Sequence, residues 1–138
     1  MRRTGRPSPL RLRRVRRADV PVLVRHRAAM WSDIGGFDPG AIRREAVAYR
    51  RWISRRLGTR RFLGWIAATR DGEVVGSGCV WVVEALPRPG EPQRWRPYIL
   101  SMYTDPAFLG RGVASSIVRA AVAWARARGF SRITLHGS

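Results

Sequence analysis

Residues 98–115 read Tyr98-Ile-Leu-Ser-Met-Tyr-Thr-Asp-Pro-Ala-Phe-Leu-Gly-Arg-Gly-Val-Ala-Ser115, and they decide the fold of this 138-residue chain. The stretch predicts a strand over residues 98–104, a short loop with a glycine turn, and a helix over residues 112–128. Gly110 and Gly112 have no Cβ, so the backbone can approach a bound group closely at both positions.

The glycine turn also predicts an anion site. The first N–H groups of a helix have no partner within the helix, and Arg111 adds positive charge to the turn. Such a helix N-terminus typically binds phosphate, and a purely structural turn is the alternative. A P-loop is excluded because the chain has no lysine. A dinucleotide fingerprint is not favoured, because Ser115 stands in place of the third glycine and no acidic residue follows about 20 positions later.

The composition is strongly basic. The chain carries 27 arginines, no lysine and a formal net charge of +18. This charge should attract polyanions and anionic cofactors in a salt-dependent way. A nucleic-acid-binding protein is the weaker alternative, because the arginines are spread along the chain and no helix-turn-helix, zinc or RNP signature is present. Nucleic acid is therefore expected only as a non-specific partner.

The cysteine count and the apolar runs bear on location. Cys79 is the only cysteine, so no internal disulfide forms, and its apolar surroundings predict a small core residue. No apolar run reaches the roughly 20 residues of a membrane span, and the N-terminus has no apolar signal region. We expect a cytoplasmic protein without a membrane segment. Residues 1–9 are expected to be a disordered basic lead-in, and residues 10–138 a single domain.

The periodicity along the chain predicts the element order β-α-α-β-β-β-α-β. This order gives an α/β (α+β) fold with a mixed, mostly antiparallel sheet flanked by helices, and a parallel last β-α-β unit. The expected elements are a strand over 10–15, a helix after Asp19 as N-cap, a helix from Asp38-Pro39 to Gly58, strands over 62–69 and 73–84 around an Asp71-Gly72 turn, a proline-rich loop over 86–97, the strand and helix quoted above, and a strand over 131–136.

The chain resembles the GNAT superfamily of N-acetyltransferases. The similarity rests on the element order, on Leu12 to Asp19 at the start, and on Met102-Tyr-Thr-Asp-Pro106 followed by Gly110-Arg-Gly-Val-Ala114. In that family an Arg/Gln-x-x-Gly-x-Gly/Ala segment wraps the pyrophosphate of acetyl-CoA. The resemblance implies a GNAT-like acyl-CoA N-acyltransferase fold. It also implies an enzyme that moves an acetyl group from acetyl-CoA to an amine, on a small molecule or a protein, by direct attack in a ternary complex.

The resemblance also implies which residues bind the cofactor. Backbone groups after the middle of the 98–104 strand would pair with the pantetheine arm, and a backbone N–H near Met102 or Tyr103 would polarise the acetyl carbonyl. The glycine turn would supply N–H groups to the pyrophosphate. The implied cofactor-binding residues are Met102, Tyr103, Thr104, Gly110, Arg111, Gly112, Val113, Ala114 and Ser115.

Two departures from the family pattern keep alternatives open. Leu109 stands where the family has Arg or Gln, which removes one side chain from the phosphate clamp. The sequence ends at Ser138, where the family continues with a strand, a helix and a strand, so the domain is expected to be incomplete at its C-terminus. The alternatives are a fragment, a truncated gene product, a chain completed by a second copy as a homodimer, and a non-catalytic relative that binds acetyl-CoA weakly or not at all.

The sequence does not identify the catalytic residues. Glu84 is the nearest candidate base by topology, with a solvent-exposed strand end as the alternative. Tyr103 is a candidate proton donor to the thiolate, with packing as the alternative. His26 is expected to be exposed in mid-helix, and His136 to be packed on the last strand. No cluster has metal-ligand spacing, so no metal is expected.

The tryptophans divide into core and cleft candidates. Trp52, Trp65 and Trp81 have the spacing of core residues, and Trp95 lies in the proline-rich loop, where it either shapes acceptor entry or covers the loop. By resemblance to the family, the end of the first helix lines the acceptor cleft. The residues concerned are Trp31, Ser32, Gly35 and Gly36.

Overall fold

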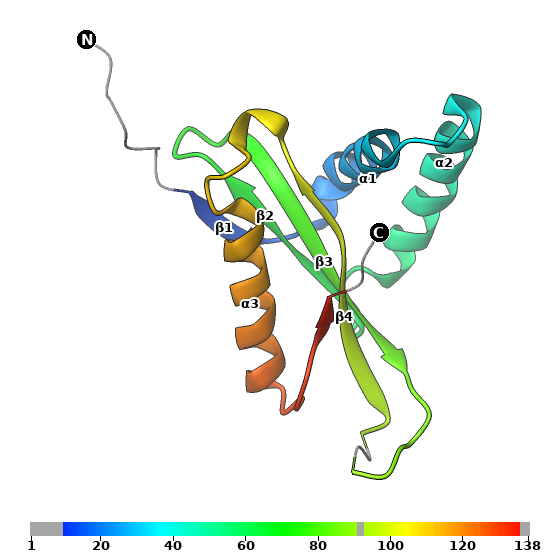
Figure 1. Cartoon of the computed structure of the whole chain (residues 1–138), viewed down its shortest axis with the longest axis vertical. Coiled ribbons are helices and arrows are strands. Elements are labelled where there is room, and N and C mark those ends of the chain that lie inside the picture. The colour runs from blue at the N-terminus through cyan, green and yellow to red at the C-terminus, as the bar shows by residue number, and fades with distance from the viewer. Residues whose placement is uncertain (1–9, 91–92, 136–138) are drawn as a thin grey trace.

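The computed structural model describes residues 10–90 and 93–135. Its elements follow the predicted order (Figure 1). The expected lead-in at residues 1–9 and the end of the last strand, with His136, lie outside the described residues. The elements are β1 (Arg11–Arg14), α1 (Val20–Ile34), α2 (Pro39–Arg56), β2 (Phe62–Ala68), β3 (Val74–Glu84), β4 (Trp95–Thr104), α3 (Val113–Ala127) and β5 (Thr134–Leu135), with short 3-10 helices at Arg17–Asp19 and Pro106–Phe108.

The strands form one five-stranded sheet in the order β1-β2-β3-β4-β5. The first four strands are antiparallel neighbours. β5 is parallel to β4, through the pairs Tyr98–Thr134 and Ile99–Leu135. The predicted mixed, mostly antiparallel sheet is therefore confirmed. α3 covers one face of this sheet, and α1 and α2 cover the other (Figure 1).

The core has two layers because successive strand residues point to opposite faces. On β2, Leu63 and Trp65 pack in the cluster that contains Ile117 of α3. Phe62 and Ile66 pack in the cluster that contains the helix residues of α1 and α2. Every residue of β2 is buried, as expected for a strand covered on both faces. Cys79 is 1% exposed, so its predicted place in the core is confirmed.

Asp19 directly precedes α1, but its carboxylate does not cap that helix. Its Oδ2 accepts hydrogen bonds from the Arg16 N–H and from Nη1 of Arg13, both at 2.7 Å, and its Oδ1 accepts from Nη2 of Arg13 at 2.8 Å. The predicted helix cap is therefore wrong in its detail. The side chain instead ties β1 to the turn before α1, and the fork of the guanidinium explains the choice because it offers two parallel donors. Asp38 does cap α2, since its Oδ2 accepts from the Ala41 N–H at 3.2 Å.

β4 begins three residues earlier than predicted. Trp95, Arg96 and Pro97 belong to the strand and pair with Glu84, Val83 and Val82 of β3. Pro97 has no N–H to donate, which weakens the strand pattern in the sequence. Its ring is nevertheless among the fully buried side chains, and burial against the sheet outweighs the missing donor. In the described part of the chain, no helix has the length and apolar character needed to cross a membrane.

Candidate functional site

A bulge interrupts β4 near its middle. Ser77 pairs with Tyr103 and Cys79 pairs with Leu100, so the single residue Gly78 faces two residues of β4. Those two residues are Ser101 and Met102. Ser101 has a φ of 56°, and it is the only non-glycine residue with positive φ in the described segments. Such a conformation is strained for a residue with a Cβ, and strain of this kind concentrates at functional sites.

The bulge places two consecutive side chains on the same face of the sheet. Leu100 and Ser101 both line a pocket on the side of α1 and α2, while Met102 packs on the opposite side in the cluster of α3. A Cβ on Gly78 would collide with the Met102 sulfur and would lie 2.8 Å from Cγ2 of Ile117. Glycine at this position therefore lets the bulge sit flush against β3.

Among the described residues, the pairing of β4 with β5 ends before the bulge. The β4–β5 ladder holds Tyr98 and Ile99 only. Within the residues that the structure describes, the stretch from Leu100 to Thr104 therefore has no strand partner on its β5 side. Backbone N–H and C=O groups along such an edge are able to pair with an extended ligand. The predicted pantetheine-binding residues Met102, Tyr103 and Thr104 lie on this edge.

The glycine turn follows directly. Gly110 and Gly112 have φ values of 76° and 81°, and no atom lies within 4 Å of a Cβ built on either. The turn thus needs glycine for its backbone conformation and is open to solvent. α3 begins at Val113, and its first closing hydrogen bond runs from Ser116 N–H to the Gly112 carbonyl at 2.9 Å.

The N–H groups that start α3 belong to residues of the predicted pyrophosphate site. Val113, Ala114 and Ser115 precede the first closed helical turn, so their N–H groups have no acceptor in the helix. Together with the helix dipole they favour an anion. Arg111 lies over the Phe108 ring, with its guanidinium carbon 5.1 Å from the ring centroid, and Leu109 is 66% exposed.

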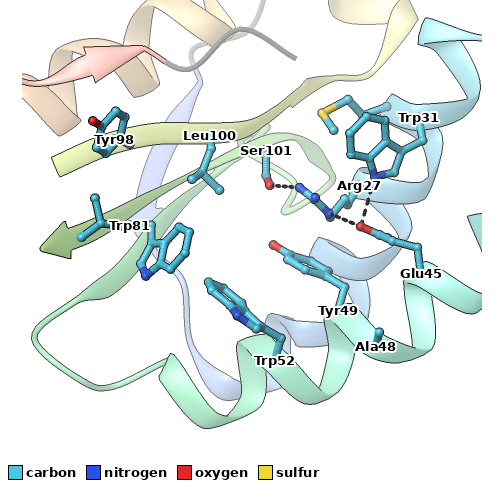
Figure 2. A pocket seen from close by; sticks show the side chains of 12 residues that line it. Arg27, Trp31, Glu45, Ala48, Tyr49, Trp52, Trp81, Tyr98, Leu100 and Ser101 are labelled. Atoms are coloured by element: carbon cyan, nitrogen blue, oxygen red, sulfur yellow. Dashed lines mark hydrogen bonds and ion pairs between the residues drawn. The ribbon is translucent and has the colours of Figure 1, made fainter. Parts of the chain in front are cut away.

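A pocket of about 680 Å³ opens on the other side of the bulge, between the two helices α1 and α2 and the strands β3 and β4 (Figure 2). Its walls are mainly aromatic. The lining residues are Arg27, Met30, Trp31, Glu45, Ala48, Tyr49, Trp52, Trp81, Val83, Tyr98, Leu100 and Ser101. The volume and the apolar lining with a few polar groups are typical of small-molecule sites.

A polar chain runs along one side of this pocket. Nε of Arg27 donates to Oε2 of Glu45 at 2.6 Å, and Nη1 of Arg27 donates to Oγ of Ser101 at 2.7 Å. Nε1 of Trp31 donates to the same Glu45 oxygen at 3.2 Å. The guanidinium lies between the Trp31 and Tyr49 rings, 5.1 Å and 4.8 Å from their centroids. Arg27 therefore connects the carboxylate on α2 to the bulge in β4, as Figure 2 shows.

Two buried polar atoms of the pocket residues have no hydrogen-bond partner. They are the second carboxylate oxygen of Glu45, Oε1, and the hydroxyl of Tyr49. Burial raises the pKa of Tyr49 well above its usual value, so its hydroxyl stays protonated. Buried polar groups in proteins are normally paired, and an unpaired set in a pocket points to a ligand or a bound water.

His26 is not exposed, contrary to the prediction from its arginine-rich surroundings. It is half-buried, its Nδ1 lies 2.7 Å from Oγ of Ser77, and its ring centroid lies 4.6 Å from that of Tyr103. Burial lowers the pKa of His26 to about 4, with a further contribution from Arg25. The ring is therefore neutral at pH 7. The Tyr103 side chain points to α1, and burial is the main cause that raises its pKa.

Glu84 and Trp95 lie away from the pocket. Glu84 is exposed, and its Oε2 accepts from Nε of Arg94 at 2.7 Å. It lies five residues along β3 from Cys79, roughly 17 Å from the bulge, which puts it out of reach of a group bound there. Trp95 lines a second, shallower pocket with Glu84, and Arg61 stacks on its ring at 3.3 Å from the centroid.

The remaining tryptophans are divided between the core and the pocket. Trp65 is 7% exposed and belongs to the core, as predicted. Trp52 and Trp81 are only half-buried, with ring centroids 5.0 Å apart, and both line the pocket. Trp31 lines the pocket, whereas Ser32, Gly35 and Gly36 are exposed and are not among its lining residues.

Glu45 and Arg27 are the important pocket residues that the sequence analysis missed. The signal for Glu45 was present, because it lies four residues before Tyr49 and seven before Trp52, so the three side chains share one face of α2. A single carboxylate on an inward face is unusual. In the described segments, no group of three or more His, Cys, Asp and Glu residues has the arrangement of a metal site.

Comparisons with known proteins agree with this architecture. The structure of a GCN5-related N-acetyltransferase from Ralstonia eutropha JMP134 is similar at 28% identity and a TM-score of 0.85. The match covers 94% of the present chain and 84% of that protein. A predicted acetyltransferase with acetyl-CoA from Clostridium acetobutylicum is similar at 23% identity and a TM-score of 0.81, and the match covers 94% of the present chain and 82% of that protein. An aminoglycoside acetyltransferase from an uncultured soil metagenomic sample, in complex with sisomicin, matches 94% of the chain over 78% of its own, at 17% identity and a TM-score of 0.66.

The sequence comparisons give the family. No curated protein matches the chain. The family model described as "Acetyltransferase (GNAT) family" matches residues 27–138, which is most of the sequence. The chain belongs to the GNAT family of acetyltransferases.

Proposed function

We propose that the protein transfers the acetyl group of acetyl-CoA to the nitrogen of an amine in a ternary complex. The observation that carries this proposal is the juxtaposition of three features around one bulge. A backbone edge at residues 102–104, which has no partner on its β5 side among the described residues, continues into a glycine turn at a helix N-terminus, and an aromatic pocket opens at Ser101. These features suit the arm of the cofactor, its phosphates and the acceptor, respectively.

The proposed reaction needs no acyl-enzyme. The neutral amine nitrogen attacks the thioester carbonyl carbon, a C–N bond forms, and the C–S bond breaks. The substrate ammonium first gives one proton to a base, and the nitrogen loses a second proton as the amide forms, which balances the proton that the departing CoA thiolate gains. The protein contributes by holding the two reactants together and by stabilising the oxyanion. We assign the oxyanion contact to a backbone N–H at Met102, in the bulge, or at Tyr103, directly after it.

In this proposal the pyrophosphate is held by N–H groups from Gly110 to Ser115. Arg111 faces the phosphates or solvent, and Leu109 adds no charge to the clamp. Binding then depends on close approach of the phosphates to the backbone at Gly112, where a large side chain would collide with them. Acetyl-CoA and CoA are the expected ligands, and no metal is required.

Calorimetric titration with acetyl-CoA tests the proposal. The purified chain should bind acetyl-CoA saturably at low and at moderate salt, whereas a short DNA duplex should be retained at low salt only. Gly112→Trp should abolish acetyl-CoA binding. Gly129→Trp is the matched control, because Gly129 lies at the other end of the same helix with a similar φ of 84° and with nothing within 4 Å of a Cβ.

Two results would contradict the proposal. A folded chain that does not bind acetyl-CoA would favour the non-catalytic alternative. Equal loss of binding in both tryptophan variants would show that helix strain, and not a phosphate contact, controls the affinity. If Gly129→Trp still binds acetyl-CoA and Gly112→Trp does not, the loss comes from the phosphate contact and not from helix strain.

A further inference from the structure

We propose that the aromatic pocket selects a primary amine with a single cationic centre and an aromatic body, and that Glu45 receives its ammonium group. This inference rests on the proposed acetyl transfer and names the class of acceptor. An arylalkylamine, with a ring joined to the amine by a short chain, has this chemistry. Four observations carry the assignment.

The first observation is the hydrogen-bond inventory of the pocket. Two Arg27 nitrogens and Nε1 of Trp31 already donate within the pocket wall, to Glu45 and Ser101. Oε1 of Glu45 still lacks a donor. Oε1 is itself buried, so an ammonium group reaches it only when the Glu45 carboxylate turns about its terminal torsion, which is soft. The group that complements it is an N–H donor, and a cationic donor forms the stronger bond.

The second observation is the aromatic wall. Tyr49 and Trp52 are nearly parallel with centroids 6.3 Å apart, and Trp52 meets Trp81 edge to face. In Figure 2, Trp52 and Trp81 lie across the pocket from the Glu45 end. A flat apolar body fits against these rings by offset or edge contacts, and the ring faces also favour a nearby cation. The pocket is thus polar at one end and aromatic at the other.

The third observation is charge. Among the described residues that line the pocket, Glu45 is the one carboxylate and Arg27 the one cation, and they are paired. The pocket therefore offers one acceptor to one ammonium group. The chain as a whole carries +18, so a second or third cationic centre on the ligand meets repulsion without a compensating carboxylate. Polyamines and aminoglycosides are disfavoured on this ground.

The fourth observation is position. Ser101 lines the pocket and is also the strained residue of the bulge, next to the proposed oxyanion contact. Arg27 joins Ser101 to Glu45 through two hydrogen bonds. An amine held near this chain lies between the aromatic wall and the place proposed for the thioester. Glu45 is a positioning residue in this account, and the deprotonating base is a separate group.

Direct binding is the first test. The full chain is titrated by calorimetry, alone and with CoA, using 2-phenylethylamine, 2-phenylethanol, n-butylamine and spermidine as probes. We expect 2-phenylethylamine to bind at least about tenfold more tightly than its uncharged alcohol and than n-butylamine, which lacks the ring. Spermidine should bind more weakly than 2-phenylethylamine. Equal binding of amine and alcohol, preference for spermidine, or no binding to the folded chain would each overturn the inference.

Paired variants test the residues. Glu45→Gln keeps the shape and removes the charge, and it should weaken 2-phenylethylamine about tenfold or more without affecting the alcohol. Glu84→Gln is the control, because that carboxylate lies outside the pocket. Ala48→Trp should fill the pocket from α2, and Val47→Trp, on an exposed and non-lining neighbour, should leave binding intact. Equal effects within either pair would overturn the assignment.

Thiol release from acetyl-CoA separates the two proposals. Binding of 2-phenylethylamine without thiol release would leave the amine site standing and would contradict acetyl transfer. Thiol release with spermidine but not with 2-phenylethylamine would support acetyl transfer and overturn the proposed acceptor class. Release with 2-phenylethylamine that falls in Glu45→Gln through KM, with kcat little changed, is the result expected for a positioning residue.

Discussion

Replacing His26 with asparagine should remove part of the acid sensitivity of the fold. His26 packs between α1 and the sheet, with Nδ1 2.7 Å from the Ser77 hydroxyl and its ring against Tyr103. Ser77 is 1% exposed, so the pair is closed to water from the strand side. Asparagine keeps a short polar group near Ser77 and cannot take up a proton in this range.

The magnitude follows from the pKa of the histidine. Burial lowers it from 6.5 to about 4, so between these values the unfolded chain binds a proton that the folded chain does not. The free energy of unfolding therefore falls as the pH falls through this window and levels off below it. The full difference corresponds to about 3 kcal/mol. Because the ring is only half-buried, solvent screening reduces the effect, and we expect about 1–2 kcal/mol.

Urea unfolding of both proteins between pH 4 and 7.5, followed by far-UV circular dichroism, gives the measurement. The difference in unfolding free energy between wild type and His26→Asn should change by about 1–2 kcal/mol across the window, in favour of the wild type at higher pH. Carboxylates that titrate near the lower limit are shared and cancel in this difference. Parallel pH profiles for the two proteins would refute the reasoning, because they would mean that His26 titrates normally in the folded state.

Two further predictions concern stability. Gly78→Ala should lower the free energy of unfolding by about 1–3 kcal/mol in urea unfolding, because the added Cβ would collide with Met102 and Ile117. Gly129→Ala is the control, because it also strains the backbone but meets no neighbour. An equal loss of stability in both variants would contradict the collision. Asp19→Asn should lower the free energy of unfolding by about 1–3 kcal/mol at pH 7, because the contacts to Arg13 and to the Arg16 N–H are weakened. The partial exposure of Arg13 limits this loss of stability. The hydrogen bond from Arg13 is the main cause that holds the pKa of Asp19 below 3.8. The stability that Asp19 contributes is therefore present above that pH and is lost as the pH falls through the lowered pKa. A difference in unfolding free energy between the two proteins that stays constant down to pH 2 would contradict this origin.

The sequence was sufficient for the element order and for the glycine turn. Hydrophobic periodicity and the turn residues are local signals, and Gly110 and Gly112 have the positive φ that their turn suggested. The start of β4 was missed because Pro97 suggests a loop, whereas its burial depends on neighbours that are distant in sequence. The predicted cofactor roles at residues 102–104 and 110–115 stay predictions.

The candidate pocket was much harder to predict. The bulge at Ser101 is defined by the pairing of β4 with β3, and residues 99–103 of β4 contain no glycine, asparagine or proline that would mark it. The contact from Arg27 to Ser101 joins residues 74 positions apart. His26 was expected to be exposed because its neighbours in sequence are charged, but it is covered by Tyr103 from another element. Glu45 was also missed, although its spacing from Tyr49 and Trp52 on one helix is a local signal.

The bulge of β4 also means that one residue of this strand is not needed for its pairing with β3. Without Ser101, Met102 would follow Leu100 directly, would stand opposite Gly78, and would still point to α3, while Tyr103 would still point to α1. The strand would thus close into an unbroken ladder with its faces unchanged. The pairing of β4 with β3 therefore does not depend on Ser101, whose hydroxyl is committed instead to Arg27 at the pocket.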